Sequence, residues 1–75
     1  MNDTLFRQKV RDSGYKYTHL CEKLGISNTA LIKKRSGKIP FKVVEINKLT
    51  ELLNLSVSER DDIFDLVSPK NNGLG

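Results

Sequence analysis

Apolar residues recur along most of the chain at intervals of three and four residues, which is the period of an amphipathic α-helix. Leu20 and Leu24 are an example, and Gly25 follows directly, as glycine does where a helix ends in a left-handed conformation. No alternating run bounded by a hairpin turn indicates a strand. The pattern therefore predicts an all-α chain with five short helices, at residues 3–13, 17–24, 28–35, 42–53 and 57–67.

Polar residues that favour helix ends support these boundaries. We expect Asp3 to cap the first helix and Ser27 the third, while Ser56 and Glu59 have capping-box spacing for the fifth. The residues of the fifth helix expected to face inward are Ile63, Phe64 and Val67. Its outward acidic residues, which we interpret as a solvated face, are Asp61, Asp62 and Asp65. The helices form one domain, residues 1–67, and the polar residues 68–75 are expected to be a disordered tail.

The helix predicted at 28–35 has almost no apolar face, because Leu31 is its one clear inward residue. Such a helix is either poorly stable or presents its other faces to a partner. The residues before it suit a close crossing of two helices: Cys21 is small, Gly25 permits a sharp turn, and Ile26 fills the gap. This combination indicates a helix-turn-helix at about residues 17–35.

Charge is distributed unevenly along the 75 residues, whose net charge is +4. Residues 1–48 carry 11 basic and 4 acidic side chains, whereas residues 49–75 carry 2 basic and 5 acidic ones. This asymmetry favours one surface that binds a polyanion. Five cations within ten residues are candidate phosphate contacts: Lys33, Lys34, Arg35, Lys38 and Lys42. The alternative for the first three is a solvated helix end, which is favourable beside the negative end of the helix dipole.

Composition argues against several other classes of protein. Cys21 is the only cysteine and His19 the only histidine, so neither a disulfide, a zinc finger nor a catalytic triad is expected. No run approaches the roughly 20 apolar residues that span a bilayer. We therefore expect a cytoplasmic, non-enzymatic protein without cofactor, metal or membrane association. Cys21 is then a small buried residue, His19 an exposed one and Tyr15 a packing residue.

The string from Leu20 to Ser27, L-C-E-K-L-G-I-S, resembles the "L-A-x-x-L-G-I-S" of the phage Cro/repressor superfamily, the XRE-like family. The sequence S-G-K at 36–38 is similar to the family's "N-G-K" loop, and residues 40–56 resemble its fourth helix and the turn beyond. The resemblance covers residues 5–67. It implies a compact five-helix domain of the lambda-repressor/Cro type.

The resemblance also implies a sequence-specific transcriptional regulator, of phage or mobile-element origin, that binds double-stranded DNA and reads the major groove with helix 28–35. The base contacts that it implies are Asn28 and Thr29, and Lys33, one turn later, would reach a base or a phosphate. The phosphate contacts that it implies are Tyr17, Ser36 and Lys38. Side-chain chemistry adds Ile32 as a contact for a thymine methyl, and Lys34 and Lys42 for phosphates. Arg35 stands where the family often has Glu, which removes a common intramolecular ion pair.

The sequence is compatible with two further partners. A homodimer, usual for such regulators, would form through helix 57–67 with its Ile63, Phe64 and Val67, unless these residues close the core instead. The alternative to DNA binding is a helix-turn-helix protein that acts on another protein, as a modulator of a repressor or an antitoxin does. An enzyme is the least favoured class, because no nucleophile–base set, phosphate loop or metal cluster is visible in the sequence.

Overall fold

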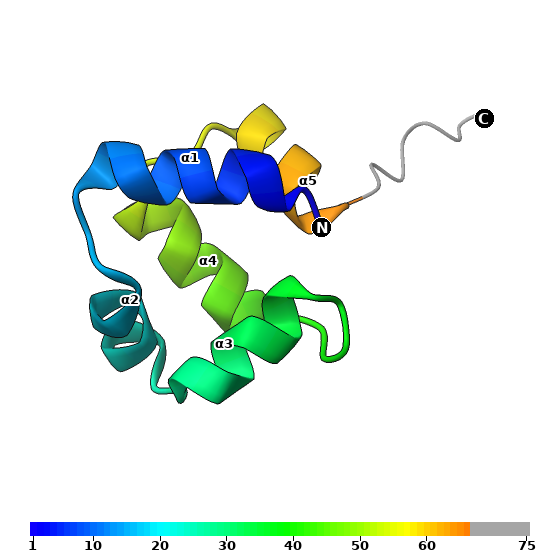
Figure 1. Ribbon diagram of the computed structural model, residues 1–75. Coiled ribbons are helices and arrows are strands. Elements are labelled where there is room, and N and C mark those ends of the chain that lie inside the picture. The colour runs from blue at the N-terminus through cyan, green and yellow to red at the C-terminus, as the bar shows by residue number, and fades with distance from the viewer. Residues whose placement is uncertain (67–75) are drawn as a thin grey trace.

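The computed structural model describes residues 1–66, and these form five α-helices without a strand. Their bounds are α1 (Asp3–Ser13), α2 (Tyr17–Leu24), α3 (Asn28–Arg35), α4 (Val43–Leu52) and α5 (Val57–Phe64). The all-helical prediction is confirmed, and the first three helices have the predicted bounds. In Figure 1, α4 crosses the middle of the molecule, with α1 above it and with α2 and α3 below. None of these helices is long and apolar enough to cross a membrane.

The core lies between α4 and the helices around it, because α4 contacts both α2 and α5. Four large side chains are fully buried there, and each comes from a different helix: Phe6, Leu20, Leu49 and Ile63. Burying each of them stabilises the fold by roughly 1.5–3 kcal/mol. The buried cluster is completed by Val10, Leu24, Leu53 and Leu55. No residue of α3 belongs to this cluster, so α3 is placed by other contacts.

The predicted stop at Gly25 is confirmed, because this residue has a positive φ of +71°. Gly14, which ends α1, likewise has a positive φ of +80°. The prediction that Asp3 caps α1 is wrong. The cap is Asn2, whose side-chain oxygen accepts the Leu5 N–H at 3.1 Å. The backbone N–H of Asn2 also donates to the carbonyl of Ile63 at 2.9 Å, which fixes the cap against α5. Asp3 is therefore the first residue of the helix, and its carboxylate is available for another partner.

The fifth helix begins as predicted, with a capping box between Ser56 and Glu59, but it ends earlier than residue 67. Asp65 adopts a left-handed conformation, with φ +55°, and donates its N–H to the carbonyl of Asp61, so the helix stops at Phe64. Asp65 also pairs with the N-terminal ammonium at 2.9 Å. The predicted Val67 and the tail predicted at 68–75 lie outside the described residues.

The residues that were predicted as a dimer contact differ in how deeply they are buried. Ile63 has no exposed surface in the single chain, so it closes the core and cannot contact a second copy. Phe64 is half-buried and packs edge-on against Phe41, with ring centroids 5.2 Å apart. Of the three aspartates, Asp62 is exposed as expected, whereas Asp61 is half-buried and pairs with Arg60 at 3.0 Å.

Candidate nucleic-acid interface

Helix α3 presents one continuous face to solvent. Its predicted base-contact residues, Asn28, Thr29, Ile32 and Lys33, are all exposed, and Ile32 has 62% of its surface accessible. At about 100° of rotation per residue, these four positions span an arc of about 140°. Leu31 points the opposite way and is 2% exposed, as predicted. The structure therefore brings the four candidate side chains together on one surface.

Hydrogen bonds and one buried side chain hold the turn before α3. The Ser27 hydroxyl caps α3 by accepting the Ala30 N–H at 3.0 Å. Cys21 is buried, and its thiol lies 3.8 Å from the carbonyl oxygen of Ser27. Burial raises the pKa of the Cys21 thiol, so the residue stays neutral at ordinary pH. The backbone N–H of Ile26 donates to the Cys21 carbonyl at 3.0 Å, which completes the turn.

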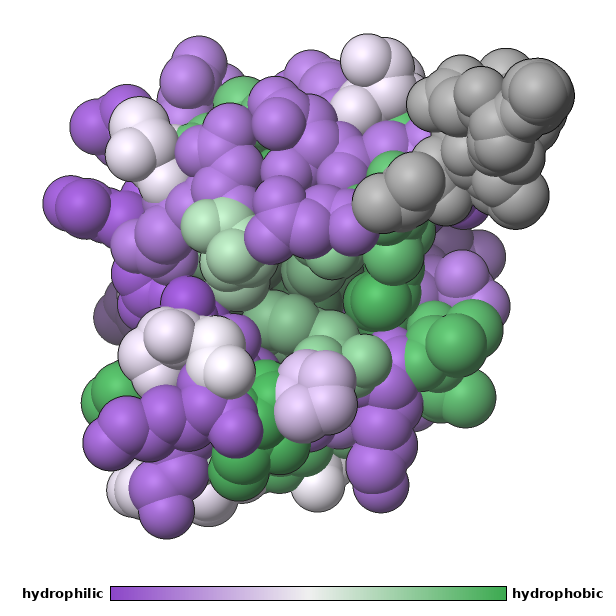
Figure 2. Space-filling model, turned by 90° about the vertical axis from the view of Figure 1, so that its right-hand side faces the viewer, coloured by the Kyte–Doolittle hydropathy of each residue, from purple (hydrophilic) through white to green (hydrophobic). Residues whose placement is uncertain are grey.

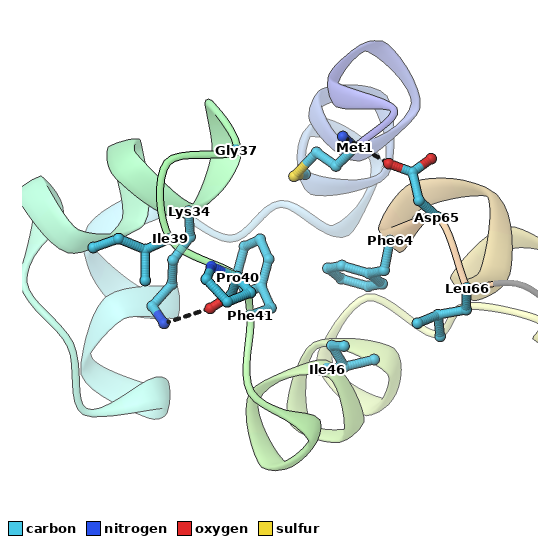
Figure 3. Close-up of a pocket in the computed structure, with 10 residues that line it drawn as sticks. All are labelled: Met1, Lys34, Gly37, Ile39, Pro40, Phe41, Ile46, Phe64, Asp65 and Leu66. Atoms are coloured by element: carbon cyan, nitrogen blue, oxygen red, sulfur yellow. Dashed lines mark hydrogen bonds and ion pairs between the residues drawn. The ribbon is translucent and has the colours of Figure 1, made fainter.

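Lys34 is not available to DNA, and its prediction as a phosphate contact is wrong. Its side chain is 7% exposed, and its Nζ lies 3.0 Å from Oε1 of Glu45. The same ammonium donates to the carbonyl of Pro40 at 3.2 Å (Figure 3) and lies 5.8 Å from the Phe41 ring centroid. Burial opposes ionisation of Glu45, but the Lys42 N–H and the Lys34 ammonium together hold its pKa below the ordinary value.

Arg35 also turns inward rather than into solvent. Its guanidinium donates to both carboxylate oxygens of Asp3, at 2.8 and 3.1 Å. It lies over two aromatic rings, 4.8 Å from the centroid of Tyr17 and 5.6 Å from that of Phe6. The hydrogen bond from Arg35 is the main reason that the pKa of Asp3 lies below its ordinary value. Arg35 thus forms an intramolecular ion pair at a position where the sequence suggested that one had been lost.

The structure gives the aromatic residues near α2 roles in packing. Tyr17, predicted as a phosphate contact, is half-buried, and its ring covers the Arg35 guanidinium. Tyr15 is 38% exposed rather than packed in the core, and it stacks on His19 with ring centroids 5.0 Å apart. His19, expected to be exposed, is therefore half-buried.

The segment between α3 and α4 carries the other candidate phosphate contacts. Ser36, Lys38 and Lys42 are exposed, and the Ser36 hydroxyl donates to the Lys33 carbonyl at 2.9 Å. Among residues 1–66, no acidic group forms an ion pair with Lys33, Lys38 or Lys42. Of the five cations singled out in the sequence, these three can meet an external anion.

No family model matches the chain, and no curated protein or solved structure matches it significantly. In the described part of the chain, no three His, Cys, Asp or Glu side chains gather as they would around a metal ion.

Two residues that shape this surface were not singled out in the sequence in that role. Asp3 binds Arg35 across 32 positions of the chain, and no local pattern connects the two. Glu45 occupies the third position of α4 and accepts the Lys42 N–H at 2.8 Å, as a helix-capping residue does. A capping signal could have been recognised there, but its second partner, Lys34, could not.

Proposed function

We propose that this chain is a sequence-specific DNA-binding regulator of transcription, of the Cro/repressor-like type, that inserts α3 into the major groove. The observation that carries the proposal is the exposed face of α3, on a helix held from behind by Leu31 and two inward cations. Its chemistry suits base edges. Asn28 can pair with adenine, Lys33 with guanine O6 and N7, and Ile32 with a thymine methyl.

Phosphate contacts would flank this face. Ser36, Lys38 and Lys42 are exposed in the segment that follows α3. On the other side, the first turn of α2 has no side-chain cap, because Lys16 forms no capping hydrogen bond. Its free N–H groups, next to Tyr17, are suited to a phosphate. The role needs no cofactor, metal or catalytic group, and it assigns the protein to the cytoplasm.

A regulator of this type is expected to bind as a dimer on half-sites about one helical turn, roughly 34–36 Å, apart. With Ile63 inside the core, the contact proposed for helix α5 shifts to its end, where Phe64 is half-buried and Leu66 is exposed. These two residues line a hollow of about 310 Å³ together with Ile39 and Phe41. Apolar surface lines a hollow on this face of the molecule (Figure 2).

A second candidate function is binding to another protein, as modulators of repressors and antitoxins do. The observation that favours it is the exposed apolar surface at the start of α4, where Val43 and Val44 are 72% and 62% exposed. Neighbouring exposed apolar residues of this kind are typical of protein contacts. A partner that co-purifies at high salt, together with absent DNA binding, would favour this alternative.

The deciding experiment is a titration of fluorescent duplex DNA, followed by anisotropy at about 50 and 200 mM salt. The duplexes are the intergenic DNA beside the gene and a scrambled control. Two neutralised phosphates, for Lys38 and Lys42, would weaken binding roughly 12-fold between these salts. Steep salt dependence with preference for the native duplex would support the regulator. Weak, salt-independent binding to both duplexes would refute it.

A further inference from the structure

An ion pair is buried beneath the segment that follows α3. Lys34 and Glu45 are 7% and 8% exposed, and Nζ lies 3.0 Å from Oε1. The ammonium also donates to the Pro40 carbonyl (Figure 3) at 3.2 Å, and Oε1 accepts the Lys42 N–H at 2.8 Å. The pair therefore holds the backbone at two points, one on each side of Phe41.

Stability alone is a poor explanation for this pair. Taking two charges out of water costs nearly as much as their attraction returns, and apolar side chains of similar volume often stabilise a protein as well or better. Leu31 shows that α3 accepts an apolar residue on its inner side. No buried polar side-chain atom in residues 1–66 lacks a hydrogen-bond partner, so the pair is fully hydrogen-bonded. A buried pair of this kind gives the chain around it one defined geometry.

The geometry that it defines is that of residues 36–42. The first half of this segment is fixed by α3, because the N–H groups of Gly37 and Lys38 donate to the carbonyls of Lys34 and Lys33. The second half is fixed by the Lys34–Glu45 pair. Lys38 and Lys42 project from this fixed backbone as exposed cations. Because the backbone is already held, the segment loses less conformational entropy when its lysines bind phosphates.

We propose that Lys34 and Glu45 are positioning residues for DNA, which fix residues 36–42 so that Lys38 and Lys42 bind phosphates beside α3. This inference rests on the proposed DNA-binding function and deepens it. Neither member of the pair touches DNA, and both act through the backbone that carries the two lysines.

The test is a mutant cycle measured by DNA anisotropy across a salt series. The variant Lys34→Met/Glu45→Leu removes both charges together and leaves no buried ion unpaired. Circular dichroism first establishes whether this double variant folds. If it does not fold, Lys34→Met/Glu45→Gln takes its place, because glutamine keeps an acceptor for the Lys42 N–H. The second arm is Lys38→Ala/Lys42→Ala, and the third combines both arms.

We expect the folded pair variant to bind less tightly, with a salt slope shallower by up to about 1.8, since each phosphate contact contributes about 0.9. Lys38→Ala/Lys42→Ala should show the same change, and the combined variant no further loss. A folded pair variant with the wild-type slope would overturn the inference and leave the proposed function intact. So would an equal loss of affinity in the Lys38→Ala/Lys42→Ala background. Salt-independent binding by the wild type would instead refute the proposed function and, with it, the inference.

Discussion

Replacing Arg35 with alanine tests how the last turn of α3 is held to the rest of the domain. The guanidinium makes two hydrogen bonds to Asp3 and covers the rings of Tyr17 and Phe6, so it connects α3 to both α1 and α2. Alanine removes all of these contacts, and as a strong helix former it keeps the helix propensity at position 35 high. The change in stability therefore reports the contacts and not the helix itself.

The magnitude follows from the geometry. The Arg35 and Asp3 side chains are 22% and 40% exposed, so solvent screens their attraction, and the ion pair contributes up to about 1 kcal/mol. Each of the two cation–π contacts contributes about 0.5 kcal/mol or somewhat more. Arg35→Ala should therefore lower the free energy of unfolding by about 2 kcal/mol. In a domain of this size, that corresponds to a melting temperature roughly 8–16 °C lower.

Thermal unfolding followed by circular dichroism measures this change, and Asp3→Asn is the matched control. Asparagine removes the ion pair but leaves Arg35 over the two rings. The free energy of unfolding should therefore fall by about half as much as in Arg35→Ala. The pKa of Asp3 is held below its ordinary value of 3.8, mainly by the hydrogen bond from Arg35. Its charge therefore contributes stability above that value, and the contribution disappears as pH falls through the lower, folded pKa. Wild type and Asp3→Asn should then converge in acid.

Two results would refute this reasoning. If Arg35→Ala melts within a few degrees of the wild type, the guanidinium is solvated and α3 is held by Leu31 and Lys34. If Asp3→Asn costs as much as Arg35→Ala, the aromatic rings contribute nothing and the ion pair alone accounts for the effect.

Four further substitutions examine the turn, the buried pair and the exposed face. Gly25→Ala should lower the free energy of unfolding, measured in urea, by about 1–2 kcal/mol. The cause is the backbone, since residue 25 has φ +71° and no atom crowds an added Cβ. An unchanged urea midpoint would mean that the turn changes conformation to accept alanine. Lys34→Met alone should lower the free energy of unfolding by about 3–5 kcal/mol, because Glu45 stays buried without its cation. A thermal stability equal to that of the wild type would contradict this prediction. Lys33→Ala should leave the melting temperature nearly unchanged and weaken the preference for the native duplex, whereas a salt slope shallower by about 0.9 would place Lys33 on a phosphate instead of guanine. Asn28→Ala should weaken the preference for the native duplex at an unchanged slope, and equal losses on both duplexes would argue against base contact.

The helices could be predicted where a single local signal decides a boundary. Ser27 caps α3 and Gly25 ends α2, as their side-chain chemistry requires. The errors arose where local signals compete or are weak. Asn2 and Asp3 are both good capping residues, and the bond from Asn2 to α5 decides between them. Asp65 ends α5 in a left-handed conformation that is more often adopted by glycine or asparagine.

The charges could not be assigned from the sequence, because their partners are distant along the chain. Lys33, Lys34 and Arg35 look alike in a basic run, and local reasoning offered only phosphates or solvent. The structure instead supplies Glu45 for Lys34 and Asp3 for Arg35. Neither pairing has a local pattern, since each depends on how α3 packs against α4 and α1. A basic run thus overstates the positive charge that a folded surface offers to a polyanion.

Helical geometry explains how this basic run acquires different roles. Successive side chains are rotated by about 100°, so Lys33 points into solvent, while Lys34 and Arg35 reach α4 and α1. An eight-residue helix with one buried leucine is too short and too polar to be stable alone. The pairs with Glu45 and Asp3 fix the position of its last turn against α4 and α1. Because its inward side chains support α3, the exposed face that begins at Asn28 can vary without cost to the fold, which suits a helix proposed to read DNA.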